Sequence, residues 1–259
     1  MPEKKKRRQI EREFGVPVAG EILDPAQWTQ TALKKLPEGL LALPNLFGRS
    51  APLVVDLGCG NGRFLIGSAV WRPTYDHLGI DVLPVVIRYA TRRANQRGLG
   101  NIRFAVIDAV RLLVRHLPPG SAAEVHCYHP QPYYDPAQVH LRLIAPHFLA
   151  LVHQALVPGG LFFIQTDNPG YWSYIRAVVP FFFDFHERIG RWPDAPKGRT
   201  RREIIALRRK LPVFRGSGPA RQGLSATEAL RLAEALPPPV FDADRRLREL
   251  DEYERRGQG

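Results

Sequence analysis

Residues 54–64 read Val-Val-Asp-Leu-Gly-Cys-Gly-Asn-Gly-Arg-Phe, and this stretch indicates the fold. An apolar, β-branched run ends in Asp56, and glycines follow at the alternate positions 58, 60 and 62. Glycine has no Cβ and tolerates positive φ, so the backbone can turn sharply here and approach a ligand closely. A strand, a glycine-rich turn and a helix at the edge of a parallel sheet form a nucleotide pocket.

The spacing of these glycines narrows the ligand. The dinucleotide fingerprint is G-x-G-x-x-G, whereas here the third glycine comes one residue early and Arg63 takes the fingerprint's last position. The pattern D-x-G-x-G-x-G resembles motif I of class I S-adenosylmethionine-dependent methyltransferases. That resemblance implies S-adenosylmethionine as the cofactor, with Asp56, Gly58 and Gly60 at its binding site. An ordinary glycine-rich turn is the alternative.

Strand and helix patterns alternate from residue 53 onward. This alternation predicts an α/β fold with a doubly wound, mostly parallel sheet and helices on both faces, as in Rossmann-like class I methyltransferases. Seven strands are predicted, at residues 53–57, 77–82, 102–107, 123–128, 160–166, 182–187 and 212–216. Helices are predicted at residues 62–71, 84–98, 109–116, 139–156, 170–180 and 201–210, with Pro158-Gly-Gly160 ending the fourth.

Composition divides the chain into three parts. Residues 1–45 are poorly periodic and begin with the basic run Lys4–Arg8, which predicts a basic N-terminal extension. Residues 46–220 carry the strand and helix alternation and form the predicted methyltransferase domain. In the tail, 221–259, Ser225 and Glu228 form a capping box before one helix, and residues 241–256 are a second, charged helix candidate.

Acidic residues end three successive predicted strands. Asp81 is placed to accept hydrogen bonds from the ribose hydroxyls of an adenosine, as the ribose acid of the Rossmann fold does. Asp108 precedes Ala109, where methyltransferases commonly hold the adenine edge. Each acid by itself could be a helix N-cap. Because Asp56, Asp81 and Asp108 end strands at the same edge of the sheet, we expect them to share one cofactor site.

Two segments after the later strands suggest a nucleobase as the substrate. Tyr128-His-Pro-Gln-Pro-Tyr-Tyr134 follows the fourth strand, where class I methyltransferases place the target base. Its prolines stiffen the loop, and its aromatic rings offer a stacking surface. Asp167, after the fifth strand, could accept hydrogen bonds from guanine or simply cap the next helix.

The chain resembles bacterial tRNA (guanine-N7)-methyltransferases from about residue 40 to 217. The resemblance rests on Leu46-Phe-Gly-Arg49, the glycine turn, Gly79-Ile-Asp-Val82, Asp108-Ala109, Pro158-Gly-Gly160, Thr166-Asp167 and a T-x-x-E element, Thr200-Arg-Arg-Glu203. It implies methyl transfer from S-adenosylmethionine to N7 of a guanosine in tRNA, position 46 in the variable loop. The guanosine would be held by Asp167, Thr200 and Glu203. Arg201 and Arg202 complete the expected substrate-binding residues, as two of the arginines in 188–221 that would hold the RNA backbone.

The chain departs from this family at one motif. The family has Pro-Asp-Pro-Trp followed by a basic stretch, and this chain has Pro130-Gln-Pro-Tyr133 followed by only His140 and Arg142. Gln131 therefore takes the place of the acid usually named as catalytic and cofactor-binding. Two alternatives stay open: an RNA-binding homologue that has lost catalysis, and a methyltransferase for an amide or exocyclic amine nitrogen. The second uses Asn-Pro-Pro-Tyr at this place, but it leaves the T-x-x-E element unexplained.

Charge and cysteine content suggest the partners and compartment. The 37 Lys and Arg against 25 Asp and Glu give a net charge of +12, which favours a polyanion such as tRNA. Eleven basic residues in 188–221, and Arg88, Arg92, Arg93 and Arg97, are the candidate phosphate contacts. Two cysteines without a C-x-x-C predict no metal site and fit the cytoplasm, and the lack of an apolar run of membrane-spanning length predicts no membrane partner. We expect a monomer or homodimer.

Overall fold

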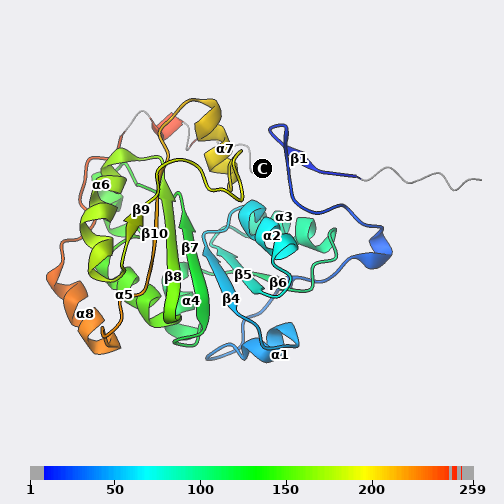
Figure 1. Ribbon diagram of the computed structural model, residues 1–259, viewed down its shortest axis with the longest axis horizontal. Coiled ribbons are helices and arrows are strands. Elements are labelled where there is room, and N and C mark those ends of the chain that lie inside the picture. Colours follow the sequence, from blue (N-terminus) through cyan, green and yellow to red (C-terminus); the bar gives the residue numbers. More distant parts are fainter. Residues whose placement is uncertain (1–8, 245–246, 250–251, 253–259) are drawn as a thin grey trace, which may run out of the picture.

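A single twisted sheet organises the chain (Figure 1). The computed structural model describes residues 9–244, 247–249 and 252. In these residues eight strands pair in the order β3-β6-β5-β4-β7-β8-β10-β9. Their bounds are Ala32–Leu33 (β3), Leu53–Leu57 (β4), Asp76–Asp81 (β5), Ile102–Val106 (β6), Ala122–Tyr128 (β7), Leu156–Thr166 (β8), His186–Glu187 (β9) and Phe214–Pro219 (β10).

The strand order confirms the predicted doubly wound class. Strands β3 to β8 of the sheet are parallel, and β10 and β9 are added antiparallel. The chain moves outward from β4 through β5 to β6 and then returns to β7, so the winding direction reverses between β4 and β7. Ligands of such sheets bind at the carboxyl ends of the strands beside that reversal. The predicted count of seven strands is wrong by one, because β3, from the N-terminal segment, pairs with β6.

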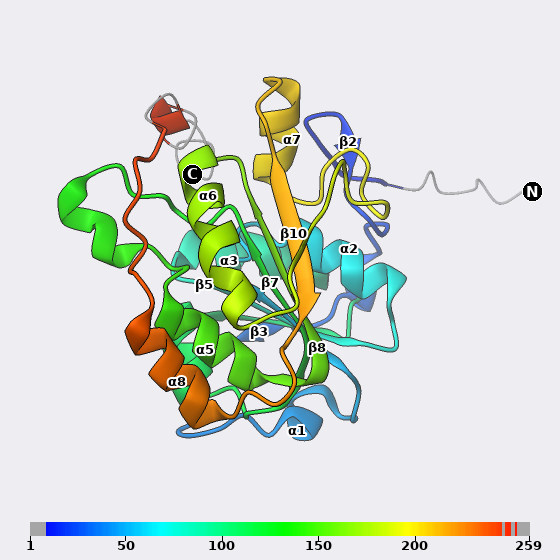
Figure 2. The same ribbon diagram turned by 60° about the vertical axis from the view of Figure 1, so that its left-hand side comes forward.

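Helices cover both faces of the sheet (Figures 1 and 2). On one face, α2 (Arg63–Trp71) and α3 (Pro84–Asn95) bury Leu65, Ile66 and Ala90. On the other, α4 (Ala109–Arg115), α5 (Pro146–Ala155) and α6 (Pro169–Val178) bury a larger apolar cluster, and α8 (Ala226–Ala235) packs on α5. Among the described residues, no helix has the length and apolar character needed to cross a bilayer.

Two helices and a two-stranded hairpin lie outside this layered core. The short helix α1 (Leu43–Phe47) precedes β4. A two-stranded hairpin of β1 (Arg12–Glu13) and β2 (Val16–Pro17) lies beside α7 (Arg201–Arg208) and above α2 in both views. This hairpin and α7 approach each other at the end of the sheet where the parallel strands finish. The N-terminal segment therefore reaches the edge that the sequence assigns to the cofactor.

Several predicted boundaries are wrong for local reasons. The predicted helix 139–156 is a 3-10 helix, Pro136–Leu141, followed by α5, because Pro146 lacks an N–H and Ala145 before it is extended. Pro158-Gly-Gly160 lies inside β8, where the register against β7 shifts, because α5 has already ended at Ala155. Of the predicted strand 182–187 only β9 forms. The run Lys4–Arg8 and half of the predicted helix 241–256 lie outside the described residues.

Candidate active site

The glycine turn connects β4 to α2 and leaves open space beside its first two glycines. Gly58, Gly60 and Gly62 all have positive φ, at 80°, 51° and 73°. A Cβ added at Gly58 or Gly60 would meet nothing within 4 Å, whereas at Gly62 it would lie 2.9 Å from the Cβ of Ala90. The first two glycines thus keep the backbone accessible to a ligand, and the third lets α2 pack against α3.

The predicted acids occupy three different environments at this edge. The Asp81 carboxylate accepts hydrogen bonds from the backbone N–H of Gly60 and of Leu83, each at 3.0 Å. Asp108 is exposed and caps α4, where its Oδ1 accepts from the N–H of Arg111 at 2.8 Å. Asp81 is therefore tied to the glycine turn, while Asp108 serves at least as the helix N-cap that the sequence allowed.

Asp56 is the most unusual of the three acids. It is 2% exposed, and its Oδ1 has no hydrogen-bond partner in the described part of the chain. Burial, together with the negative charge of Asp81, raises the pKa of the Asp56 carboxyl to about 8. A buried, unpartnered carboxyl oxygen costs free energy unless a donor or a cation reaches it. This atom therefore points to a positively charged or hydrogen-bonding ligand group.

One cavity joins the cofactor turn to the predicted substrate segments. It has a volume of about 1200 Å³ and lies along the carboxyl ends of β4, β5, β6 and β7. Its lining includes the predicted residues Asp56, Gly58, Gly60, Asp81, Asp108, Ala109, Gln131, Thr200, Arg201 and Arg202. Ten of the twelve predicted site residues thus meet at one place, and the exceptions, Asp167 and Glu203, do not line the cavity.

The loop after β7 presents Gln131 to this cavity. Gln131 is exposed, and His129 and Tyr133 on either side of it have positive φ, at 51° and 42°. The loop is fixed from behind by Arg142, which is 4% exposed and donates to the carbonyls of Pro132 and Tyr133 at 2.6 and 2.9 Å. Arg142 also donates to two carbonyls of the C-terminal segment, those of Pro239 and Phe241. It therefore holds the loop in place and is not available as a surface contact for RNA.

The T-x-x-E element forms the first turn of α7. The Thr200 hydroxyl accepts from the N–H of Glu203 at 3.0 Å, which makes Thr200 the N-cap. The Glu203 carboxylate is fully buried, accepts from the N–H of Arg199 at 2.7 Å and forms an ion pair with Arg215. The spacing T-x-x-E is thus explained locally by capping, and Glu203 is enclosed by its partners.

Asp167 is enclosed in a similar way. It is 4% exposed and forms an ion pair with Arg202 at 2.7 Å, and His129 lies 3.5 Å away on its other side. Burial opposes its ionisation, but His129 and Arg202 together lower the pKa of the Asp167 carboxyl below its usual range. Asp167 therefore links the ends of β7 and β8 to α7, and Arg202 is held at the cavity wall.

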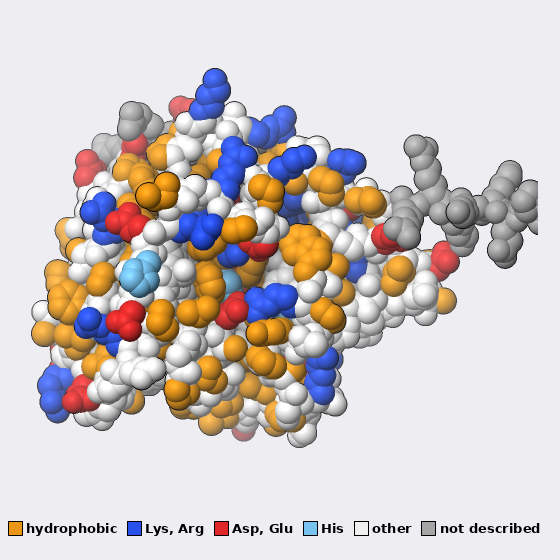
Figure 3. Space-filling view, viewed as in Figure 1, with side chains coloured by type: hydrophobic (Ala, Val, Ile, Leu, Met, Phe, Trp, Pro, Cys, Tyr) orange, Lys and Arg blue, Asp and Glu red, His pale blue; other side chains and the backbone are white. Residues whose placement is uncertain are grey.

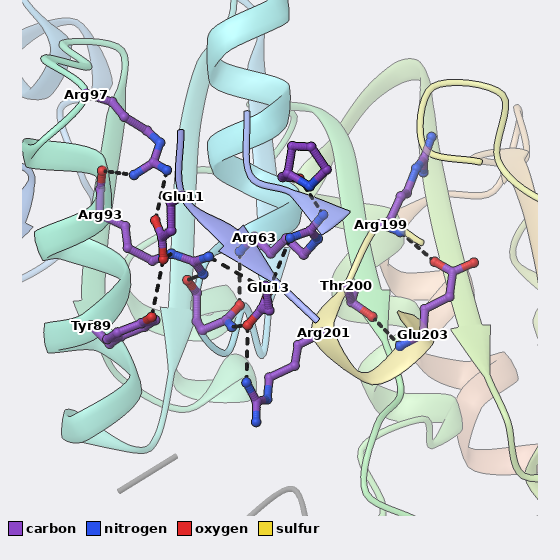
Figure 4. A network of polar contacts seen from close by, with 12 residues as sticks. Glu11, Glu13, Arg63, Tyr89, Arg93, Arg97, Arg199, Thr200, Arg201 and Glu203 are labelled. Atoms are coloured by element: carbon purple, nitrogen blue, oxygen red, sulfur yellow. Dashed lines mark hydrogen bonds and ion pairs between the residues drawn. The ribbon is translucent and has the colours of Figure 1, made fainter. Parts of the chain in front are cut away.

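The N-terminal hairpin contributes a polar network that sequence patterns did not reveal (Figure 4). Glu13 is 8% exposed; it accepts from Asn61 at 2.6 Å and pairs with Arg63 and Arg201, each at 3.3 Å. Glu11 pairs with Arg93 on α3 at 3.0 Å and with Arg97, just beyond the end of α3, at 2.9 Å. Glu13 also lies 3.8 Å from Arg93. Glu13 thus connects the cofactor turn to α7 across the mouth of the cavity.

A second missed network runs along β7. Arg72 binds Glu124 at 2.8 Å, Glu124 contacts His126 at 3.0 Å, and His126 contacts the Tyr128 hydroxyl at 2.7 Å. This network of polar contacts ends at Arg199, which donates to the Tyr128 hydroxyl at 2.6 Å and pairs with Asp194. Burial lowers the pKa of His126 to about 4 and raises that of Tyr128. Alternate positions on one strand share a face, so the periodicity of 124, 126 and 128 was the available signal.

The basic residues of 188–221 fall into two groups. Five of them are ion-paired with acids of the chain: Arg199, Arg201, Arg202, Arg215 and Arg221. The others are exposed: Arg188, Arg191, Lys197, Arg208, Arg209 and Lys210. Figure 3 shows Lys and Arg side chains gathered along the top of this face, over α7 and the loop before it. The surface beside the cavity is thus basic, although part of the predicted set is paired with acids of the chain.

Metal and disulfide chemistry have no candidate residues in the part of the chain that the structure describes. No group of three or more His, Cys, Asp or Glu side chains there is arranged to hold a metal ion. Cys59 and Cys127 are both buried and free.

The winding of the sheet, the glycine turn and the acids at the strand ends define a class I methyltransferase.

Comparisons with known proteins agree with this class. A family model described as "Putative methyltransferase" matches residues 50–209. The tRNA (guanine-N(7)-)-methyltransferase of Halorhodospira halophila is 33% identical over 186 residues, covering 70% of this chain and 80% of that protein. The enzyme of the same name from Alkalilimnicola ehrlichii is 31% identical over 191 residues, covering 72% and 81%. The chain belongs to the tRNA (guanine-N7)-methyltransferase family.

Solved structures share the fold. The 16S rRNA methyltransferase KamB superposes with a TM-score of 0.55 at 16% identity, covering 74% of this chain and 98% of that one. At this identity the similarity concerns the fold alone. The family assignment therefore rests on the sequence relatives, and the structural neighbour agrees with the doubly wound sheet.

Proposed function

We propose that the protein transfers a methyl group from S-adenosylmethionine to N7 of a guanosine in tRNA, at position 46 of the variable loop. One observation carries this proposal: a single cavity is lined both by the glycine turn with its acids and by Gln131, Thr200 and Arg201. The family's cofactor and substrate elements thus face the same space. The exposed basic residues over α7 support a polyanionic substrate.

The residues at the strand ends fit S-adenosylmethionine. Gly58 and Gly60 leave a cradle that side chains would fill. Asp81, held by the N–H of Gly60, is the acid that we assign to the ribose hydroxyls. We assign the unpartnered oxygen of Asp56 to the side of the methionine ammonium group, which would supply the missing positive charge. Asp108 and Ala109 are assigned to the adenine.

The chemistry asks for positioning more than for proton transfer. The cofactor supplies an electrophilic methyl group on a sulfonium. Guanine N7 offers a lone pair and carries no proton, so no side chain has to act as a general base, and the rate depends on alignment and local electrostatics. We propose that Gln131, on its rigid loop, accepts a hydrogen bond from guanine or from the cofactor amine through its amide oxygen. A glutamine lacks the charge-assisted bond of the family's aspartate.

The substrate side divides into contacts and supports. We propose that Thr200, Arg201 and Arg202, which line the cavity, contact the guanosine and its phosphate. Asp167 and Glu203, which we expected to bind guanosine directly, are enclosed by Arg202 and Arg215. We therefore propose that they act as positioning residues for α7 and its arginines.

The test is a methyl-transfer assay on bulk tRNA with labelled S-adenosylmethionine. Nuclease digestion and mass spectrometry should find N7-methylguanosine, and mapping should place it at position 46. Methylation of a different atom would refute the N7 assignment, and cofactor binding without any methylated product would refute the proposed activity.

Gln131 favours one competing function, an RNA-binding homologue without catalysis. Replacing Gln131 with Asp restores the family's residue at the place where this chain departs from the family. If the wild-type protein binds tRNA and S-adenosylmethionine but is inactive, and the Asp variant gains turnover, this second function is the correct one. Activity of the wild-type protein excludes it.

A further inference from the structure

A second cavity opens at the edge of the sheet, next to the cofactor cavity. It has a volume of about 1050 Å³ and lies between the short strand β3, the end of β6, and helices α3 and α4. Because β3 has only two residues, it covers only part of β6, and Val106 beyond it is 46% exposed. Ile107 and Asp108 line both cavities. We call the second cavity the edge groove.

The edge groove is strongly basic. Five cationic side chains line it: Lys34, Arg88, Arg92, Arg111 and Arg115. All five residues are exposed, and none has an ion pair with a described residue. The acids that line the groove are Glu38 and Asp108. The groove therefore carries an excess of positive charge that the rest of the described chain does not neutralise.

The arginines on the two faces of α3 differ in whether an acidic side chain pairs with them. Arg93 on α3 and Arg97, just beyond its end, face the N-terminal hairpin, where Glu11 pairs with both. Arg88 and Arg92, on the groove side, have no such acid. From the sequence we predicted all four arginines as phosphate contacts. In the structure only Arg88 and Arg92 are accessible, because Arg93 and Arg97 are buried.

The spacing of the groove's arginines suits an anion. Arg88 and Arg92 on α3, and Arg111 and Arg115 on α4, are each separated by four residues, which places their Cβ atoms about 5 to 6 Å apart on one helix face. Like charges at this spacing repel each other. A phosphate placed against each pair would remove that repulsion and accept hydrogen bonds from both guanidinium groups.

We propose that the edge groove binds the sugar–phosphate backbone of the tRNA at nucleotides outside the target guanosine. The proposal rests on the proposed function, since it takes the same tRNA as the ligand. The groove adjoins the cofactor cavity, so one RNA that inserts its guanosine beside Gln131 can continue along the edge of the sheet. Phosphate contacts of this kind position a nucleic acid without reading its sequence.

The experiment uses the full chain and two double variants, Arg88→Gln/Arg92→Gln and Arg111→Gln/Arg115→Gln. The control is Arg176→Gln/Arg231→Gln, exposed residues on α6 and α8, which lie on the opposite side of Figure 1 from α3. The tRNA Kd is measured by fluorescence anisotropy at several salt concentrations, and the Kd of S-adenosylhomocysteine by calorimetry. Thermal melting confirms that each variant folds.

Each groove variant should reduce the slope of log K against log salt by about 1.4 to 1.8, because two phosphate contacts are lost. It should also weaken tRNA binding at least tenfold at physiological salt, with S-adenosylhomocysteine binding unchanged. A slope equal to that of the control overturns the proposal. If the groove variants keep the salt dependence of the control but lose binding to polyaspartate, the proposal is also overturned, and the groove binds an acidic protein instead.

Failure of the proposed function gives a different result. If the wild-type protein makes no N7-methylguanosine but its tRNA binding still depends on the groove arginines, the activity is refuted and the groove is not.

Discussion

Binding of the cofactor should release a proton from Asp56. Without a ligand, burial and the nearby Asp81 raise the pKa of this carboxyl to about 8, so at neutral pH Asp56 is mainly protonated. A methionine ammonium group placed beside its unpartnered Oδ1 favours the carboxylate and lowers that pKa again. Binding and ionisation of Asp56 are therefore linked.

The pKa of Asp56 sets how strongly the cofactor affinity depends on pH. One pH unit below the pKa, ionising the carboxyl costs about 1.4 kcal/mol, and each further unit costs the same again. Cofactor affinity should therefore rise about tenfold per unit between about pH 5.5 and 7. The stability of the ligand-free protein should change in the opposite direction. Because the folded state binds the extra proton, stability falls as pH rises from the unfolded pKa toward about 8.

Calorimetry with S-adenosylhomocysteine, which keeps the ammonium group, measures the linkage directly. Titrations at about pH 6.5 in buffers of different ionisation enthalpy should show release of close to one proton by the wild-type protein. Asp56→Asn should release almost none, and Asp108→Asn, as the matched control, should behave like the wild type. Tight binding by the wild-type protein with no proton release would refute the assignment of Asp56 to the ammonium group.

Three further changes test the rest of the site. Glu13→Gln should raise the KM for tRNA roughly tenfold in steady-state assays. The reason is that Glu13 holds Arg201 by a charge-assisted contact worth about 1.5 to 3 kcal/mol. The matched variant Glu11→Gln should lower the melting temperature but leave the KM unchanged. Gly62→Ala and Gly60→Ala should each destabilise the fold by about 1 to 2 kcal/mol in urea unfolding, because φ is positive at both. Gly62→Ala should cost more, because its Cβ would also lie 2.9 Å from that of Ala90, whereas Gly60→Ala, which faces open space, should in addition weaken cofactor binding; equal destabilisation would contradict the different roles. Gln131→Asp should change kcat by less than about tenfold in single-turnover assays, since N7 carries no proton to remove; a larger gain would show that the charge matters.

Local patterns were sufficient for the centre of the fold. The strand ending at Leu57 and the glycine turn were predicted to the residue, because continuous apolar residues and positive-φ glycines are decided by the chain around them. The boundary errors arose where one residue overrode a pattern. Pro146 starts a helix inside a segment whose apolar spacing looked like one long helix.

Charge pairing could not be predicted in the same way. A sequence shows that Arg201 and Arg202 are basic, but not that Glu13 and Asp167 lie beside them, because those partners come from distant parts of the chain. Glu203 was predicted to bind the ligand for the same reason, because the sequence does not show that Arg215 pairs with it. Arg142 looked like a remnant of a basic RNA-binding stretch, and its four carbonyl partners give it a structural role.

The contact between Glu13 and Arg201 also has a consequence for how the protein is made. The two residues are 188 positions apart. At a synthesis rate of about 5 to 20 residues per second, Glu13 is made roughly 10 to 40 s before its partner. During that interval the hairpin acid can meet Asn61 and Arg63 but not α7. The contact that joins the hairpin to α7 is therefore completed late in translation, long after the cofactor turn has been synthesised.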